Sequence, residues 1–137
     1  MKIVVLWVLI LSMGHSKDIW IIAHKNFPTQ HLSAKMIRAI YLDKKRYVGG
    51  QNVLPINYGF DDAVRGCFEK SILKKSRHSL ETYWRRAHYK GRQPPKVVKT
   101  PEMLFEYVKS VETAIGYIDE KLPGDSDFKV LYQGRCR

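Results

Sequence analysis

The chain has 137 residues, which is the length of one ordinary domain and enough to bury a sizeable hydrophobic core. Hydrophobic residues make up 45% of it and charged residues 27%, a composition that excludes an intrinsically disordered chain. There are 24 Lys and Arg against 13 Asp and Glu, and the resulting net charge of +11 indicates an anionic partner or surface without indicating a fold.

The N-terminal residues have the pattern of a secretory signal peptide. A positive charge at Lys2 precedes an apolar run over residues 3–11, and small residues spaced two apart follow at Ser12, Gly14 and Ser16. The apolar run is much shorter than the roughly 20 residues that a membrane-spanning helix needs. The pattern therefore predicts export rather than a membrane anchor.

The expected cleavage divides the chain into two parts. We expect residues 1–16 to be a signal peptide, with the mature protein beginning at His15 or Lys17, and residues 17–137 to form a single domain. The protein is then expected in the periplasm or outside the cell. No transmembrane segment is expected after the signal is removed.

The first part of the expected domain alternates strand and helix patterns. Residues 18–23 form a continuous apolar run that is typical of a strand covered on both faces. A one-faced apolar pattern predicts a helix after Ser33, whose hydroxyl can cap the free N–H groups. Residues 53–57 are a second predicted strand. Asp61 and Asp62 then begin a helix whose apolar face carries Val64, Cys67, Phe68 and Ile72.

The second part continues this alternation. An amphipathic helix is predicted from Ser79, and another from Thr100 to about residue 111. Thr100 can cap the second helix, and Pro101 suits its first position because no N–H is needed there. Further strands are predicted over residues 97–98, 114–118 and 128–132. The order of elements predicts an α/β fold in which helices flank a mixed sheet.

The two cysteines allow one disulfide. Export to an oxidising compartment permits a bridge between Cys67 and Cys136, whereas the apolar neighbours of Cys67 also suit a buried free thiol. The sequence leaves both alternatives open. Neither cysteine has the spacing of a metal ligand, and no two of the five histidines are three to five residues apart, so we predict no metal site.

A resemblance to a known family runs along most of the chain. Residues 32–50 (LSAKMIRAIYLDKKRYVGG) resemble a segment of the phosphate-type periplasmic substrate-binding proteins of ABC transporters. Four shorter stretches continue the resemblance in the same order, namely residues 54–57 (LPIN), 83–84 (YW), 91–95 (GRQPP) and 114–118 (AIGYI). Together the five stretches are most similar to short, single-lobe members of this family.

The resemblance implies both a fold and a function. The implied fold is a single periplasmic-binding-protein type II-like lobe formed by residues 17–137. The implied function is that of an exported solute-binding module, which is not an enzyme and has no cofactor. Its ligand would be a small phosphate-like anion held by backbone N–H groups at a helix N-terminus, and its partner a membrane transporter or sensor.

The residues at the implied anion site differ from the family pattern. The phosphate binders have an arginine after the second strand, where this chain has Asn57, and Ser-Gly-Thr at the next helix start, where it has Asp62, Ala63 and Val64. These four residues and Arg65 are our anion-binding candidates. Because Asp62 places a carboxylate at the positive end of the helix, we expect a degenerate site that binds phosphate weakly.

The charge distribution supports an alternative function. Residues 35–99 carry 16 Lys and Arg against 5 Asp and Glu, a net charge of +11. Within them, residues 83–92 interleave aromatic and basic side chains, as do proteins that stack single-stranded nucleic acid. The alternative is therefore a basic protein that binds an anionic polymer or an acidic partner through residues 35–99, with nonspecific polyanion binding. Its basic surface candidates are Arg85, Arg86, Lys90 and Arg92.

The aromatic residues of this stretch also allow a purely structural explanation. Tyr83 and Trp84 have the helical spacing of residues that face a core, in which case the neighbouring cations form a solvated rim.

The sequence has no Gly-x-Ser-x-Gly, His-Glu-x-x-His or P-loop pattern, so an enzyme is not predicted. The directions of four arginine side chains should distinguish the two functions, namely those of Arg38, Arg65, Arg85 and Arg86. Convergence on the helix start at Asp61 favours a small-anion site, and outward directions favour a polymer surface.

Overall fold

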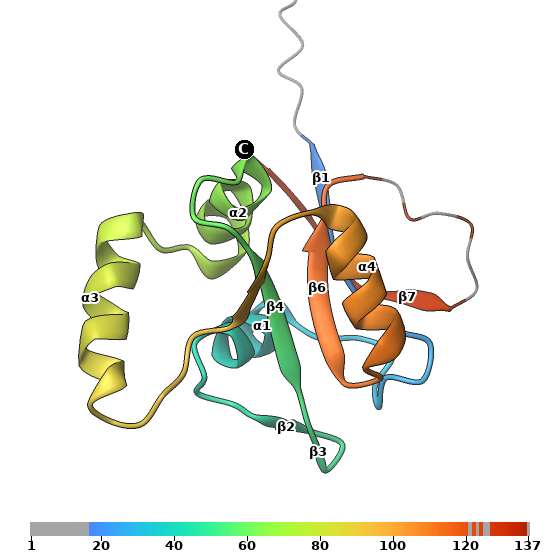
Figure 1. Ribbon diagram of the computed structural model, residues 1–137, viewed down its shortest axis with the longest axis horizontal. Helices are drawn as coiled ribbons and strands as arrows, with labels where there is room; N and C mark the ends of the chain where they lie inside the picture. The colour runs from blue at the N-terminus through green and yellow to red at the C-terminus, as the bar shows by residue number, and fades with distance from the viewer. Residues whose placement is uncertain (1–16, 121, 123, 125–126, 137) are drawn as a thin grey trace, which may run out of the picture.

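The computed structural model describes residues 17–120, 122, 124 and 127–136 (Figure 1). The predicted signal peptide at residues 1–16 lies outside the described residues. No helix in the described part of the chain is both long enough and apolar enough to cross a membrane.

A mixed sheet of five strands forms the centre of the domain, as the sequence predicts. The central strand β6 runs parallel to β4, which in turn runs parallel to the edge strand β5, while β1 is antiparallel to both β6 and β7. Across the sheet the order is β5 (Lys96–Val98), β4 (Leu54–Tyr58), β6 (Ala114–Ile118), β1 (Asp18–His24) and β7 (Phe128–Arg135).

Helices cover the sheet. In Figure 1 the helix α4 lies in front of the sheet, against β6 and β1, and α1 lies behind it. Gly116 lets α4 approach β6 closely, since a Cβ atom there would come within 2.6 Å of Leu104. The helical elements are α1 (Ala34–Tyr41), α2 (Ala63–Phe68), the π-helical turn η1 (Glu69–Leu73), α3 (Arg77–His88) and α4 (Pro101–Ser110).

The predicted helix starts are confirmed at three of four positions. The hydroxyls of Ser33 and Thr100 accept N–H hydrogen bonds from the first turns of α1 and α4, and Asp62 caps α2 in the same way. The predicted start at Ser79 is wrong by two residues, because α3 begins at Arg77. Ser76 is the cap, and its hydroxyl accepts the N–H of Ser79.

Several boundaries also differ from the sequence expectation. The second predicted helix is interrupted, since α2 ends at Phe68 and the chain continues as the π-helical turn η1. A short hairpin, β2 (Tyr47–Val48) and β3 (Gln51–Asn52), was not predicted. Its turn is formed by Gly49 and Gly50, whose φ angles of 56° and 77° favour glycine. β7 extends beyond residue 132 because it pairs with the whole length of β1.

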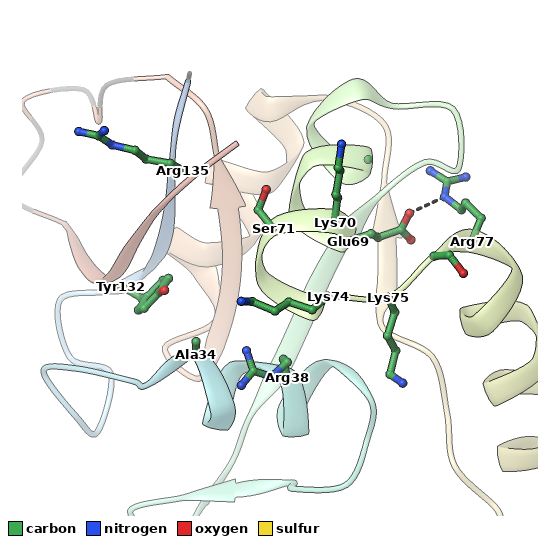
Figure 2. Close-up of a pocket in the computed structure, with 12 residues that line it drawn as sticks. Ala34, Arg38, Glu69, Lys70, Ser71, Lys74, Lys75, Arg77, Tyr132 and Arg135 are labelled. Carbon is green, nitrogen blue, oxygen red and sulfur yellow. Dashed lines mark hydrogen bonds and ion pairs between the residues drawn. The ribbon is translucent and has the colours of Figure 1, made fainter. Parts of the chain in front are cut away.

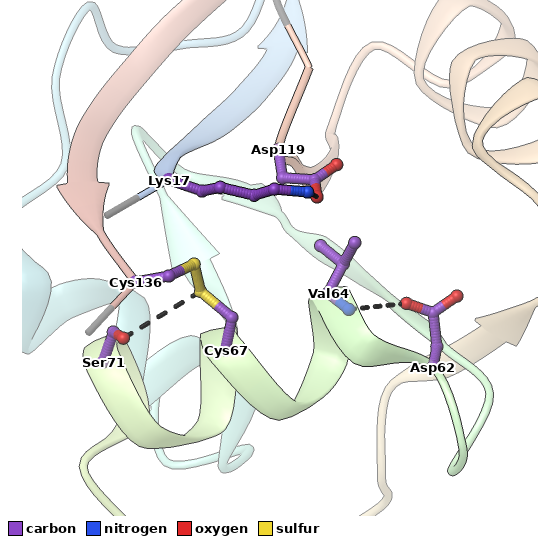
Figure 3. The surroundings of a disulfide bond; sticks show 7 residues. All are labelled: Lys17, Asp62, Val64, Cys67, Ser71, Asp119 and Cys136. Carbon is purple, nitrogen blue, oxygen red and sulfur yellow. Dashed lines mark hydrogen bonds and ion pairs between the residues drawn. A yellow bond between two sulfur atoms is a disulfide. The ribbon is translucent and has the colours of Figure 1, made fainter. Parts of the chain in front are cut away.

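A disulfide joins α2 to the end of the sheet (Figure 3). It links Cys67 in α2 with Cys136, which directly follows β7, and the two Cα atoms are 5.3 Å apart. The backbone N–H of Cys136 donates a 2.7 Å hydrogen bond to the carbonyl of Lys17 at the start of β1. The disulfide therefore fastens the end of β7 to α2, and the hydrogen bond of Cys136 fastens the same end to the start of β1.

We predict that replacing both cysteines by serine destabilises the domain by about 4 kcal/mol, because the bridge closes a loop between residues separated by 69 positions and so restricts the unfolded chain. Urea unfolding, monitored by circular dichroism, measures the loss. The unmodified protein should lose a similar amount when it is reduced, whereas reductant should not change the double variant. A loss below about 1 kcal/mol would contradict the loop-closure argument.

Candidate functional site

Asn57, the first of the anion-binding candidates, is part of the core. Its side chain lies at the end of β4 and is 7% exposed. The Oδ1 atom accepts a 3.0 Å hydrogen bond from the N–H of Tyr58 and a second one from the hydroxyl of Tyr117. Burial holds the pKa of Tyr117 well above its ordinary value, so the hydroxyl remains a proton donor. The oxygen of Asn57 is therefore used to join β4 to β6.

The start of α2 brings together three further anion-binding candidates, Asp62, Ala63 and Val64. The Oδ1 atom of Asp62 accepts a 2.8 Å hydrogen bond from the N–H of Val64, as Figure 3 shows. This N–H is one of the donors that would otherwise face an anion. Ala63 and Val64 supply no hydroxyl group. The positive helix end is thus capped by a carboxylate of the chain itself.

The guanidinium of Arg65 has partners within the protein. Its Nη1 atom donates a 3.0 Å hydrogen bond to the carbonyl of Tyr58, and its Nε atom lies 3.1 Å from Oε2 of Glu69. Glu69 is 4% exposed, and its other carboxylate oxygen accepts from Nε of Arg77. The guanidinium of Arg77 also lies 4.0 Å from the ring centroid of Phe60. One buried carboxylate is therefore neutralised by two arginines.

The sequence analysis missed Glu69 and Arg77. The spacing of Arg65 and Glu69, four residues apart in a helical stretch, is a local pattern that could have indicated their ion pair. Nothing local indicates that Arg77, which follows a break in the helix, completes the group.

A hollow of about 380 Å³ lies beside α3 and the residues that follow it. Arg86, Lys90 and Arg92 line it, whereas Arg85 is exposed outside the lining. Arg92 is partly occupied, since its Nη1 atom donates a 2.9 Å hydrogen bond to the carbonyl of Asp43.

The aromatic residues of this stretch divide between the core and the surface. Tyr83 and Trp84 pack against the hydrophobic core, and the Tyr83 hydroxyl donates to the carbonyl of Leu42. Tyr89 is 87% exposed. The interleaved pattern thus includes core packing, and two of its aromatics are not available for base stacking.

A second groove, larger and more basic, was not predicted (Figure 2). It measures about 1310 Å³ and lies between the N-terminal half of α1, the turn η1 with the residues that follow it, and β7. Its one acidic lining residue is Glu69, which already has two arginine partners. We call it the basic groove, and its cationic lining residues are Arg38, Lys70, Lys74, Lys75, Arg77 and Arg135.

The arginines singled out in the sequence do not converge on Asp61. Arg38 lines the basic groove, where its Nη1 atom donates a 3.2 Å hydrogen bond to the carbonyl of Ile72. Arg65 faces Glu69, and Arg85 and Arg86 are exposed on α3. Among the described residues, no group of three or more His, Cys, Asp or Glu side chains is arranged to hold a metal ion.

Solved structures with the same fold are phosphate-transport proteins. An ABC-type phosphate transport receptor from Vibrio cholerae superposes with a TM-score of 0.64 at 14% identity, over 85% of this chain and 46% of the receptor. A Clostridium perfringens protein described as a phosphate ABC transporter substrate-binding protein, with bound phosphate, gives 0.66 at 21% identity, over 85% and 44%. PstS from Borrelia burgdorferi gives 0.56 at 15% identity, over 75% and 41%.

The fold is that of a single periplasmic-binding-protein lobe. The family resemblance predicted from the sequence is thereby confirmed for the fold, and the chain spans less than half the length of these solved relatives. No family model matches the sequence, and no curated protein matches it significantly.

We predict that Glu69→Ala destabilises the lobe by about 3 kcal/mol, because it leaves the partly buried guanidinium of Arg65 without its counter-charge. Chemical denaturation measures the change. The matched control is Lys109→Ala, which removes one partner of an exposed ion pair at 3.8 Å and should cost less than about 1 kcal/mol. Equal losses in the two variants would show that the Glu69 contacts contribute no more than a surface pair.

Proposed function

We propose that the protein is an exported, non-enzymatic solute-binding module whose phosphate-type site is degenerate. The observation that carries this proposal is the hydrogen bond from the N–H of Val64 to the carboxylate of Asp62 at the start of α2. A phosphate group there would meet a fixed negative charge and one N–H fewer. The absence of a serine or threonine hydroxyl at residues 62–64 further weakens the site.

The described lobe would hold an anion weakly by itself. An anion in contact with one lobe stays partly hydrated, and water and salt then screen its attraction to the protein. A membrane transporter or sensor is the partner class that fits such a module. The solved relatives are binding proteins, which supports a function other than catalysis.

We predict that the unmodified protein binds inorganic phosphate with a Kd well above about 1 μM. Asp62→Ser should tighten phosphate binding about fivefold, since it removes a repulsion of roughly 1 kcal/mol between charges about 4 Å apart in a water-like environment. Serine keeps an oxygen that can cap the helix. Isothermal calorimetry on both proteins tests this prediction.

The matched control is Asp61→Ser. Asp61 is exposed and carries the same charge one residue earlier, but Asp62 is the residue that accepts the N–H of Val64. The control should therefore improve phosphate binding less than Asp62→Ser does. Tight phosphate binding by the unmodified protein would overturn the proposal of a degenerate site.

Export is part of the proposal and has its own test. We predict that the protein isolated from its native host begins at His15 or Lys17, because the signal-like segment ends in small residues at alternating positions. N-terminal sequencing, or the intact mass, measures this directly. A protein that retains Met1 and is found in the cytosol would contradict export and leave the phosphate prediction untouched.

The alternative function, a basic protein that binds an anionic polymer through residues 35–99, is favoured by one observation. Five of the six cations of the basic groove belong to this segment, namely Arg38, Lys70, Lys74, Lys75 and Arg77. The α3 surface supports this function less, because Tyr83 and Trp84 contact the core and Arg92 contacts Asp43.

A further inference from the structure

We propose that the basic groove binds a linear polyanion without bases, of which inorganic polyphosphate is the simplest example. The groove is separate from the start of α2, and none of Asp62, Ala63 or Val64 lines it. The proposal gives the alternative function a place and a ligand class, and it does not depend on the degenerate phosphate site.

The charge of the groove is not neutralised by the protein itself. Within the described part of the chain, no ion pair is formed by four of its cations, Arg38, Lys70, Lys74 and Lys75. The carboxylate of Glu69 does not neutralise these four cations, because its two oxygens are paired with Arg65 and Arg77. Counter-charge for the groove must therefore come from solution, and a bound anion would release the small ions that otherwise gather there.

Two of these cations are directed into the same space from opposite sides. Arg38 extends from α1 and is held by its hydrogen bond to the carbonyl of Ile72. Lys74 follows η1, and in Figure 2 its side chain extends toward Tyr132 and Ala34, into the groove that Arg38 also lines. Two like charges facing one cavity repel each other, and an anion between them would relieve this repulsion.

The backbone at Lys74 is unusual for its residue type. Its φ of 53° is left-handed, a conformation that disfavours every residue with a Cβ atom and that glycine adopts readily. The preceding element is a π-helical turn, which in other proteins is frequent at functional sites. A lysine at this position is therefore not explained by backbone preference. Its charge in the groove supplies a reason.

The open shape favours a chain of charges over a single ion. The groove measures about 1310 Å³, far more than one phosphate fills, and Lys70, Lys74 and Arg135 are exposed. A single phosphate would stay hydrated and be screened by salt. A linear polyanion can contact several cations at once, and each contact adds the gain from released counterions.

The lining also argues against single-stranded nucleic acid. Proteins that hold single strands without sequence preference stack successive bases on aromatic side chains. Among the residues that the structure describes, Tyr132 is the one aromatic residue that lines the basic groove, and it is partly buried. The groove thus provides charge without a stacking surface, which suits a polyanion that has no bases.

The test compares two pairs of variants in the full chain, with short inorganic polyphosphate as the probe. The groove variant Arg38→Gln with Lys74→Gly removes two charges from the groove, and glycine suits the left-handed backbone, so folding should be preserved. The control variant Arg85→Ala with Arg86→Ala removes two charges from the exposed face of α3. Fluorescence competition at several salt concentrations gives the affinity and its salt dependence, and thermal unfolding checks the fold.

We expect the groove variant to lose about tenfold or more in affinity, and its slope of log K against log salt to fall by about one to two, since each neutralised charge contributes roughly 0.7 to 0.9. The control should change the affinity less than about threefold. Lys74→Gly alone should also weaken binding while keeping or raising thermal stability.

Three results would overturn the proposal: no polyphosphate binding at low salt, equal losses in the groove and control variants, or tighter binding of an oligothymidylate of equal charge. The last result would indicate base stacking instead. Asp62→Ser should raise phosphate affinity by the same factor in the groove variant as in the unmodified protein. The two proposals can therefore fail independently of each other.

Discussion

The buried carboxylate of Glu69 is the constraint on which both candidate sites depend. A carboxylate that is 4% exposed needs counter-charge in contact, and Arg65 and Arg77 supply it. The guanidinium of Arg65 is thereby engaged by the protein and is not free to bind an anion at the start of α2. Arg77 is drawn to the end of η1, where α3 begins. The same interaction that removes a cation from the phosphate-type site thus fixes the wall of the basic groove.

The stretch formed by α2 and η1 has charges of opposite sign at its two ends. Asp61 and Asp62 lie at its start, and Lys74 and Lys75 follow its end. Helix ends usually carry charges of these signs, because carboxylates suit the N-terminal end and cations the C-terminal end. Carboxylates at the start of α2 therefore stabilise the fold, whereas a phosphate site there requires the helix start to be free of negative charge. Stability of the segment and phosphate binding at its start make conflicting demands on residue 62.

The sequence predicted features that short segments decide and missed those that distant contacts decide. The caps at Ser33 and Thr100, and the apolar runs of β1 and β6, follow from neighbouring residues alone. The disulfide joins Cys67 to Cys136, which are 69 positions apart. The basic groove is formed by residues of α1, η1 and β7, which are also distant in the sequence. The α3 stretch was harder to interpret because aromatic spacing is the same for core packing and for a stacking surface.

The disulfide connects the basic groove to the compartment in which the protein is proposed to work. Cys136 directly follows Arg135, which lines the groove, and Cys67 lies in the helix that leads into η1. The bridge therefore holds the β7 wall of the groove against the wall formed by η1. Disulfides persist in oxidising compartments and are rare in the cytosol, so this bond between the two walls is consistent with the proposed export. The relative position of the cations on these two walls, Arg135 on one and Lys70 and Lys74 on the other, is therefore fixed by a covalent bond, and an anionic chain would meet them already arranged.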